Sequence, residues 1–214
     1  MNFQQQLADM KQKIEGGMPQ AALDIMHEAT KELAASGIQD GVVEVGDAMP
    51  AFNLPNEELQ PVISSDLLAK GPLVITFYRG VWCPYCNIDL SNLNQYQLAI
   101  EEAGANMVAI SPEQAKHSQS ITKRRKLTFP ILTDAGNAFA EQLGLRFTLP
   151  QALQDLYLSF GIDLKAYNGD PSWTLPMPAR LLVDQSGVIR YAESSPDYTQ
   201  RPDPDELMDV LATL

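Results

Sequence analysis

The residue types best suited to chemistry lie in one short stretch, which holds both cysteines of the chain, Cys83 and Cys86. An apolar, β-rich run at 73–78 precedes the pair, and a helix-compatible segment at 87–102 follows it. Cys83 is therefore expected at a helix N-terminus, where unpaired backbone N–H groups and the helix dipole favour a thiolate over a thiol. Pro84 supports this placement, because proline suits the first helical position.

Two other uses of a Cys-x-x-Cys pair are less favoured. A zinc site needs further ligands, yet the chain has no other cysteine and only two histidines, His27 and His117, which lie far apart. A structural disulfide across two residues restricts the unfolded chain little. We therefore interpret the pair as redox-active, with one intramolecular Cys83–Cys86 disulfide in the oxidised protein. No metal, nucleotide or flavin site is indicated, so no cofactor is expected.

Composition and charge restrict the class of partner. The 214 residues carry a formal net charge of −12, and 45% of them are hydrophobic, which is ordinary for a globular protein. A negative surface argues against nucleic acid and anionic membranes. No stretch reaches the length of a membrane span, and residues 1–6 lack the basic start and apolar run of a signal peptide. We therefore expect a cytoplasmic protein that uses its cysteines for redox chemistry.

Two amphipathic helices are expected ahead of the redox stretch, separated by a break at 16–19. Apolar residues share one face of each helix: Phe3, Leu7, Met10 and Ile14 in the first, and Ala22, Met26, Ala29 and Leu33 in the second. Such stripes usually cover the chain's own core, and pairing with another chain, as in a homodimer, is the alternative. We predict a helical extension at 1–44 and a main domain at 45–214.

The segments after the pair complete an α/β pattern. A buried type of strand at 106–111 makes a β-α-β unit with the redox strand and its helix. The further elements expected are a helix at 112–126, a strand at 129–134, a helix at 138–143, a hairpin at 175–192 and a helix at 204–214. The stretch 146–171 shows no clear period and is predicted to be an insertion, either a lid over the site or a cover for the sheet edge.

From about Gly46 to Tyr191 the sequence resembles the thioredoxin-fold superfamily, and within it the peroxiredoxin-like branch related to alkyl hydroperoxide reductase and the bacterioferritin-comigratory proteins. The pieces that carry the resemblance are the strand with Trp82-Cys83-Pro84-Tyr85-Cys86, Ile110-Ser111-Pro112, Phe129 to Asp134, and Pro178 to Gly187. The resemblance implies an α/β, thioredoxin-like fold of peroxiredoxin type, with three α/β/α layers and an N-terminal helical extension. It also implies Cys83 and Cys86 as catalytic residues and Arg79, Trp82, Pro178 and Arg180 as substrate-binding residues.

Two families on this scaffold use their cysteines differently. In thioredoxins the first cysteine attacks, the second resolves and a cis-proline faces them, which implies those places for Cys83, Cys86 and a cis Pro178. In peroxiredoxins the attacking cysteine aligns with Cys86, where Arg79 and Arg180 would stabilise its thiolate. Because the overall similarity is to peroxiredoxins, this alignment favours Cys86 as the residue that meets peroxide. Arg79 replaces the family's proline, however, and Cys83 replaces its threonine.

The function implied by the resemblance is that of an antioxidant peroxidase. One thiolate attacks a hydroperoxide, the other cysteine closes the disulfide, and thioredoxin or a similar dithiol restores both thiols. The family's arginine aligns with Pro178, and Arg180 lies two residues further on. This displaced arginine and the missing threonine make a thioredoxin-like disulfide reductase the alternative. A redox-sensing protein that binds a partner through its N-terminal helices is the non-enzymatic alternative. Cys-Pro-Tyr-Cys is also similar to glutaredoxin, whose fold is far shorter, and that family ranks third.

Overall fold

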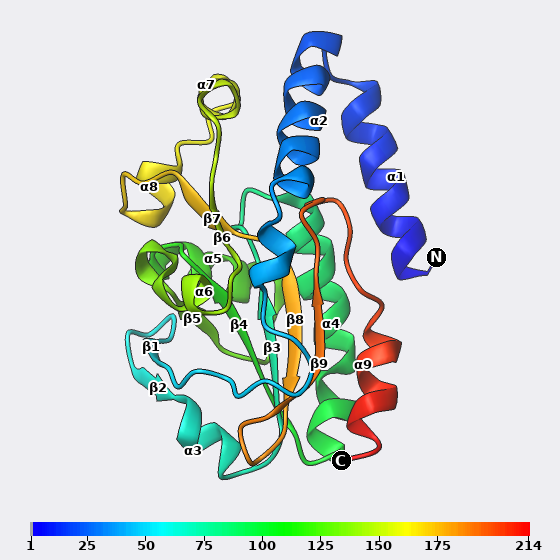
Figure 1. The fold of residues 1–214 in the computed structure, drawn as a ribbon, viewed down its shortest axis with the longest axis vertical. Coiled ribbons are helices and arrows are strands. Elements are labelled where there is room, and N and C mark those ends of the chain that lie inside the picture. The colour runs from blue at the N-terminus through cyan, green and yellow to red at the C-terminus, as the bar shows by residue number, and fades with distance from the viewer. Residues whose placement is uncertain (1) are drawn as a thin grey trace.

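A five-stranded mixed sheet forms the centre of the molecule, with strand order β5-β4-β3-β8-β9 (Figure 1), in a computed structural model that describes residues 2–214. Its strands are β3 (Leu73–Phe77), β4 (Asn106–Ser111), β5 (Ile131–Thr133), β8 (Ala179–Val183) and β9 (Ile189–Ser194). The first three are mutually parallel, and β8 and β9 continue the sheet as an antiparallel hairpin. The predicted β-α-β unit and C-terminal hairpin are confirmed.

The central strand β3 is covered on both faces, because its residues alternate between two cores. Leu73, Ile75 and Phe77 pack into the core on one face, and Val74 packs into the core on the other. Such double burial explains why the run is continuously apolar. The strand delivers the chain to Cys83 from the middle of the sheet, where the backbone is held by a neighbour on each side.

Helices cover both faces of the sheet, so the predicted α/β/α layers are confirmed. One face carries α1 (Phe3–Gly16), α4 (Pro84–Glu102), α5 (Ala115–Arg125) and α9 (Pro204–Leu211). The other carries β1 (Asn53–Pro55), β2 (Pro61–Ile63), α3 (Ser64–Leu68) and α6 (Ala138–Gln142). The long helix α4 begins directly after Cys83, three residues before the predicted start.

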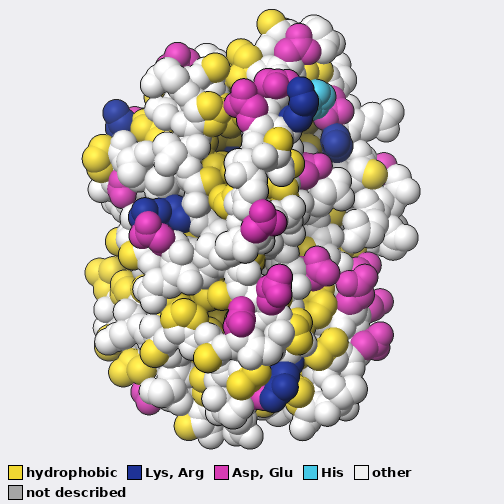
Figure 2. Space-filling model, viewed as in Figure 1, with side chains coloured by type: hydrophobic (Ala, Val, Ile, Leu, Met, Phe, Trp, Pro, Cys, Tyr) yellow, Lys and Arg dark blue, Asp and Glu magenta, His cyan; other side chains and the backbone are white. Residues whose placement is uncertain are grey.

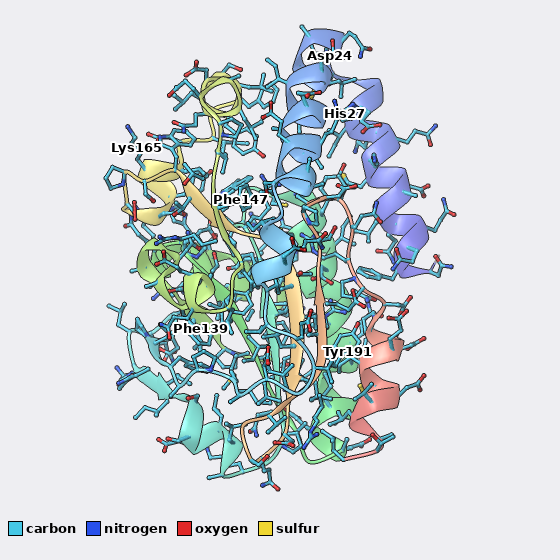
Figure 3. The ribbon with its side chains drawn as sticks, in the orientation of Figure 1. Asp24, His27, Phe139, Phe147, Lys165 and Tyr191 are labelled. Atoms are coloured by element: carbon cyan, nitrogen blue, oxygen red, sulfur yellow. The ribbon has the colours of Figure 1, made fainter. Side chains whose placement is uncertain are left out.

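The two N-terminal helices pack on the chain's own domain. Phe3 and Leu7 on α1 are buried in the core that contains α4, while α2 (Gln20–Ala35) lies against α7 (Gln151–Ser159) (Figure 1). His27 on α2 contacts Glu15 on α1, with 3.0 Å between Nε2 and Oε1 (Figure 3). The predicted helices and their break are confirmed, and the domain boundary at 44/45 stays a prediction.

The stretch 146–171 contains regular secondary structure, so the prediction that it has no period was wrong. It contains β6 (Arg146–Thr148), α7 (Gln151–Ser159) and α8 (Leu164–Asn168), and β6 pairs with β7 (Thr174–Pro176). A third apolar cluster joins this insertion to α2 through Leu149, Leu153, Tyr157, Leu164, Trp173 and Leu175 against Ile25, Met26 and Ala29. Trp82 packs against the same cluster, so the insertion and α2 together cover the cysteine end of the sheet.

The surface reflects the composition of the chain. Acidic side chains predominate over basic ones on the face drawn in Figure 2, as the net charge of −12 requires of the whole molecule. Between residues 2 and 214, none of the helices combines the length and the apolar character needed to cross a bilayer.

The packing of α1 makes a prediction about stability. Leu7→Ala should lower the free energy of unfolding by about 2 to 3 kcal/mol, because it removes a buried side chain and leaves a cavity beside α4. The control is Leu98→Ala on α4, where the side chain is 65% exposed and the change should stay within about 0.5 kcal/mol. Equal midpoints for the two variants in urea unfolding would show that α1 does not pack on this domain.

Candidate active site

The cysteine pair lies where β3 turns into α4. The Cys83 N–H donates to the Gly80 carbonyl at 3.0 Å, and the Cys83 carbonyl accepts from the Asn87 N–H at 3.1 Å, so Cys83 is the N-cap of α4. Pro84 occupies the first helical position, as predicted. Both cysteines are reduced and buried, with exposures of 2% for Cys83 and 0% for Cys86.

A buried glutamate supports the turn before Cys83. Glu113, which follows β4, accepts the Val81 N–H through Oε2 at 2.9 Å. A Cβ on Gly80 would lie 2.8 Å from Glu113 Oε1 and would collide with the Trp82 indole nitrogen, so only glycine allows this approach. Burial raises the pKa of Glu113 to about 8, against the opposing effect of the hydrogen bond from the Val81 N–H. The carboxyl group is therefore mostly neutral at pH 7.

Arg79 is enclosed by aromatic side chains. Its guanidinium carbon lies 4.3 Å from the ring centroid of Tyr198 and 4.9 Å from that of Trp82, and Nη2 donates to the Tyr157 hydroxyl. Burial favours the neutral form, but the interactions with the Tyr157 oxygen and with the Cys83 thiolate outweigh it and raise the pKa of Arg79. Arg79 therefore keeps its charge inside the site.

A second arginine contacts the other sulfur. Arg201 Nη2 lies 3.0 Å from Cys86 Sγ, and Nη1 donates to the carbonyls of Tyr198 and Gln200 at 2.8 and 2.6 Å. Its Nε lies 3.5 Å from Asp89 Oδ2. The loop that carries Arg201 thus fixes the guanidinium against the pair.

Arg180 is linked to the cysteines only indirectly, through Asp89 and Arg201. Its Nη2 pairs with Asp89 Oδ1 at 2.5 Å, and its Nη1 donates to the Pro202 carbonyl at 2.9 Å. The two groups of the ion pair are both 1% exposed. Arg180 therefore holds the aspartate that also pairs with Arg201, whereas the sequence placed Arg180 itself beside Cys86.

The pKa values of the two thiols are shifted in opposite directions. Burial alone raises the pKa of Cys83, but a hydrogen bond from the Cys86 thiol and the charges of Arg79 and Arg201 lower it from 9.0 to about 6. Burial raises the pKa of Cys86 well above its ordinary value, and its hydrogen bond to Cys83 and the Cys83 charge raise it further. The reduced pair is therefore a thiolate on Cys83 that accepts a hydrogen bond from the Cys86 thiol.

One sequence prediction about the site was wrong. The Met177–Pro178 peptide bond is trans, as are all peptide bonds in the described residues. Met177 N–H donates to the Leu145 carbonyl and the Pro178 carbonyl accepts from Ser195 N–H, at 2.8 and 3.1 Å. These bonds hold the chain extended between β7 and β8, which suits the lower-energy trans form. Pro178 still lies beside Arg79, in the wall of a cleft.

That cleft, of about 240 Å³, leads from the surface to Arg79. Its walls come from α2, from the 147–150 segment with α7, and from the site itself. The apolar and aromatic side chains of these walls include Ala29, Leu33, Leu153, Tyr157 and Tyr198, together with Phe147, which Figure 3 labels beside α2. The cleft is mainly apolar, and its polar lining consists of Thr30, Glu32, Ser36, Thr148 and the buried Arg79.

The structure brings four of the predicted residues, Arg79, Trp82, Cys83 and Cys86, into one cluster. Sequence reasoning missed Glu113, Arg201, Asp89, Tyr157 and Tyr198. Asp89 carried a usable signal, because it lies three residues after Cys86 and so on the same helix face. Arg201 carried none, since it comes from an irregular loop 115 residues away from its sulfur partner.

A three-layer α/β/α fold with a Cys-x-x-Cys pair at a strand–helix junction is the architecture of a thiol oxidoreductase. The chain belongs to the AhpC/TSA family, whose sequence pattern matches residues 45–192. The resemblance to peroxiredoxins that the sequence suggested is thereby confirmed.

The relatives are distant. The chloroplastic peroxiredoxin Q of Triticum aestivum is 25% identical over 173 residues, covering 81% of this chain and 69% of its own length. That of Sedum lineare is 26% identical over 172 residues, or 80% of each chain. The crystal structure of peroxidoxin BcpB from Mycobacterium tuberculosis superposes with a TM-score of 0.64 at 21% identity, over 80% of this chain and 98% of that one. This likeness confirms the thioredoxin-like peroxiredoxin fold.

The buried carboxyl of Glu113 predicts a pH dependence of stability. Folding raises its pKa from 4.5 to about 8, so the folded state holds a proton that the unfolded state has lost between these values. The contribution of Glu113 to the free energy of unfolding should therefore fall as pH rises from 4.5 to about 8, and should be constant above that. Glu113→Gln keeps the shape of the side chain but cannot titrate. The difference between the free energies of unfolding of wild type and variant, measured in urea at each pH, therefore gives the contribution of Glu113. A difference that does not change with pH would refute the assignment.

Proposed function

We propose that the protein is a thiol peroxidase that reduces hydroperoxides through Cys83 and Cys86 and is recycled by a thioredoxin-type dithiol. The observation that carries the proposal is the Cys83 thiolate under the charges of Arg79 and Arg201, with a second thiol hydrogen-bonded to it. Membership of the AhpC/TSA family supports a hydroperoxide as the oxidant.

The first step is a nucleophilic attack by the Cys83 thiolate on the terminal oxygen of the hydroperoxide. A sulfur–oxygen bond forms, the O–O bond breaks, and the products are a sulfenic acid on Cys83 and an alkoxide or hydroxide that takes up a proton. Negative charge moves from sulfur to the leaving oxygen. The Arg79 guanidinium, fixed in place before the reaction, stabilises charge there without reorganisation.

The second step uses Cys86. Its sulfur attacks the sulfenic sulfur, the S–O bond breaks, and the Cys86 proton leaves with the hydroxide as water. The product is the predicted Cys83–Cys86 disulfide. An external dithiol then exchanges with this disulfide, returns two thiols and leaves as a disulfide itself.

We assign the attack to Cys83, although the family alignment favoured Cys86. Cys83 has the lowered pKa, caps the helix, and is flanked by the arginine at the base of the cleft. Cys86 is the more deeply buried sulfur and is mostly protonated near neutral pH. A protonated thiol is a poor nucleophile, so its role is to resolve the intermediate.

A disulfide reductase is the second candidate function. The same asymmetry, with an acidic first cysteine and a buried second one, suits attack on a substrate disulfide as well as on a peroxide. Peroxide consumption with thioredoxin and its reductase supports the peroxidase. Reduction of a disulfide substrate without peroxide consumption would support the reductase.

A cytoplasmic location and a homodimer stay predictions, as does the absence of nucleic-acid and membrane partners.

Serine substitutions test the order of attack. After one equivalent of hydroperoxide, Cys86→Ser should carry a sulfenic acid on Cys83 that a dimedone-type trap labels, because the resolving thiol is absent. Cys83→Ser should give no adduct on Cys86, since burial keeps that thiol protonated. Mass spectrometry of the tryptic peptides distinguishes the two. Labelling confined to Cys86 in Cys83→Ser would reverse the assignment.

Thiol titration of the wild type provides the matched check on the second step. The reduced protein should show two thiols, and after mild peroxide treatment none, with the two restored by a dithiol reductant. Two free thiols after treatment would rule out the disulfide cycle.

A further inference from the structure

The segment 195–203, which joins β9 to α9, lies over the cysteine pair, and we call it the 195–203 loop. Tyr198 packs against the buried cluster that contains both sulfurs, and Arg201 Nη2 lies 3.0 Å from Cys86 Sγ. Cys83 and Cys86 are at most 2% exposed, and neither lines the cleft between α2 and α7. A dithiol on another molecule therefore reaches the disulfide only if a covering segment moves.

The neighbours of the pair are held by contacts that its oxidation leaves intact. Strand β3 is hydrogen-bonded on both sides, α4 packs on the sheet, and the third apolar cluster joins α7 to α2. The loop is anchored at its start by the Ser195 N–H, which donates to the Pro178 carbonyl at 3.1 Å. Near its end the Arg201 carbonyl accepts from Gln4 Nε2 on α1 at 3.1 Å, and the Arg201 guanidinium contacts the Cys86 sulfur. The guanidinium is thus the anchor that depends on the cysteines.

The loop has open space beside it, because Pro196 and Tyr198 line two cavities. The first is the cleft of about 240 Å³ beside α7, and the second, of about 210 Å³, is bounded by α1 and α2. In Figure 1 the chain rises from β9 toward α2 and then descends along α1 to α9. Since well-packed interiors resist displacement, such space is what a movable segment requires.

Oxidation removes the negative charge near Arg201. The reduced pair carries one such charge, on Cys83. A hydroperoxide takes two electrons from the pair, the S–S bond forms, and the oxygens leave as an alcohol and water with one proton taken from solvent, so the disulfide is neutral. Burial lowers the pKa of Arg201, but the cysteine sulfurs and Asp89 raise it above its ordinary value, against the charge of Arg79. In the oxidised protein this repulsion remains, and Asp89 is shared with Arg180.

We infer that the 195–203 loop is a redox-controlled cover, which Arg201 closes over the reduced pair and which opens when the disulfide forms. This inference rests on the proposed function and adds a control of its recycling step. Arg79 is enclosed by side chains of the site and Arg180 lies on β8, so Arg201, on an irregular loop, is the cation that can leave. Its departure takes Tyr198 away from the sulfurs and admits the dithiol reductant. Return of the thiolate closes the loop again.

Hydrogen–deuterium exchange, read by mass spectrometry of peptic peptides, compares the reduced protein with protein oxidised by diamide, which forms the disulfide without a peroxide. Amides of the 195–203 loop should exchange about tenfold or more faster in the oxidised form, since each loss of about 1.4 kcal/mol in contacts raises the open population tenfold. Strand β4 should exchange equally in both forms. Equal exchange of the loop in both forms, or a rise of the same size in β4, would overturn the inference.

Arg201→Met removes the charge and keeps most of the side-chain length. In this variant the loop should exchange equally in the two redox forms, at the rate of the oxidised wild type, because the contact that oxidation breaks is already absent. Arg124→Met, the same change at an exposed position on α5, should keep the wild-type redox difference. A redox difference of wild-type size in Arg201→Met would overturn the role of Arg201.

Thermal unfolding checks that both variants fold, and the wild-type comparison decides the inference without them. If the loop responds to diamide as described but no peroxide is consumed, the redox-controlled cover holds and the peroxidase proposal fails. If peroxide is consumed but the loop does not respond, the peroxidase proposal holds and the cover fails.

Discussion

The structure of the site depends on an excess of buried positive charge. Arg79, Arg180 and Arg201 are each at most 5% exposed, and Asp89 is the buried carboxylate that pairs with two of them. Glu113 adds little negative charge near neutral pH, because burial keeps it protonated. A buried cation without an anion is costly, so the arrangement favours a negative charge on the cysteine pair. The Cys83 sulfur meets that need, which links the stability of the fold to the reactivity of the thiolate.

Four segments far apart in the sequence supply this environment. Arg79 follows the end of β3, and the cysteines and Asp89 lie at the start of α4. The loop before α9 carries Arg201, and α7 carries Tyr157, whose hydroxyl accepts a hydrogen bond from Arg79. Sheet hydrogen bonds hold the strand β3, α4 packs on one face of the sheet, and the third apolar cluster holds α7. When the disulfide forms, the thiolate disappears while the arginines remain. The oxidised site is therefore electrostatically less balanced than the reduced one, which favours its return to the dithiol.

Local patterns carried most of what the sequence could predict. The apolar run of β3, Pro84 at the helix start and the turn of the β8–β9 hairpin are each determined by neighbours in the chain, and all three were found. Helix α7 was missed although Leu153, Leu156 and Tyr157 follow helical spacing, because the helix has only 9 residues. Arg201 and Glu113 could not be found, since their roles arise only when distant loops fold against the cysteines. The cis Pro178 was carried over from thioredoxins, and the hydrogen bonds around it favour the extended trans chain instead.

The claim on which the account rests is that the buried arginines place the thiolate on Cys83. The pH dependence of alkylation by iodoacetamide, read at each cysteine by mass spectrometry of the reduced wild type, tests it most directly. The account predicts that the Cys83 rate rises with a midpoint at about pH 6, while Cys86 stays unmodified until far higher pH. A Cys83 midpoint near the ordinary value of 9.0, or earlier modification of Cys86, would contradict it.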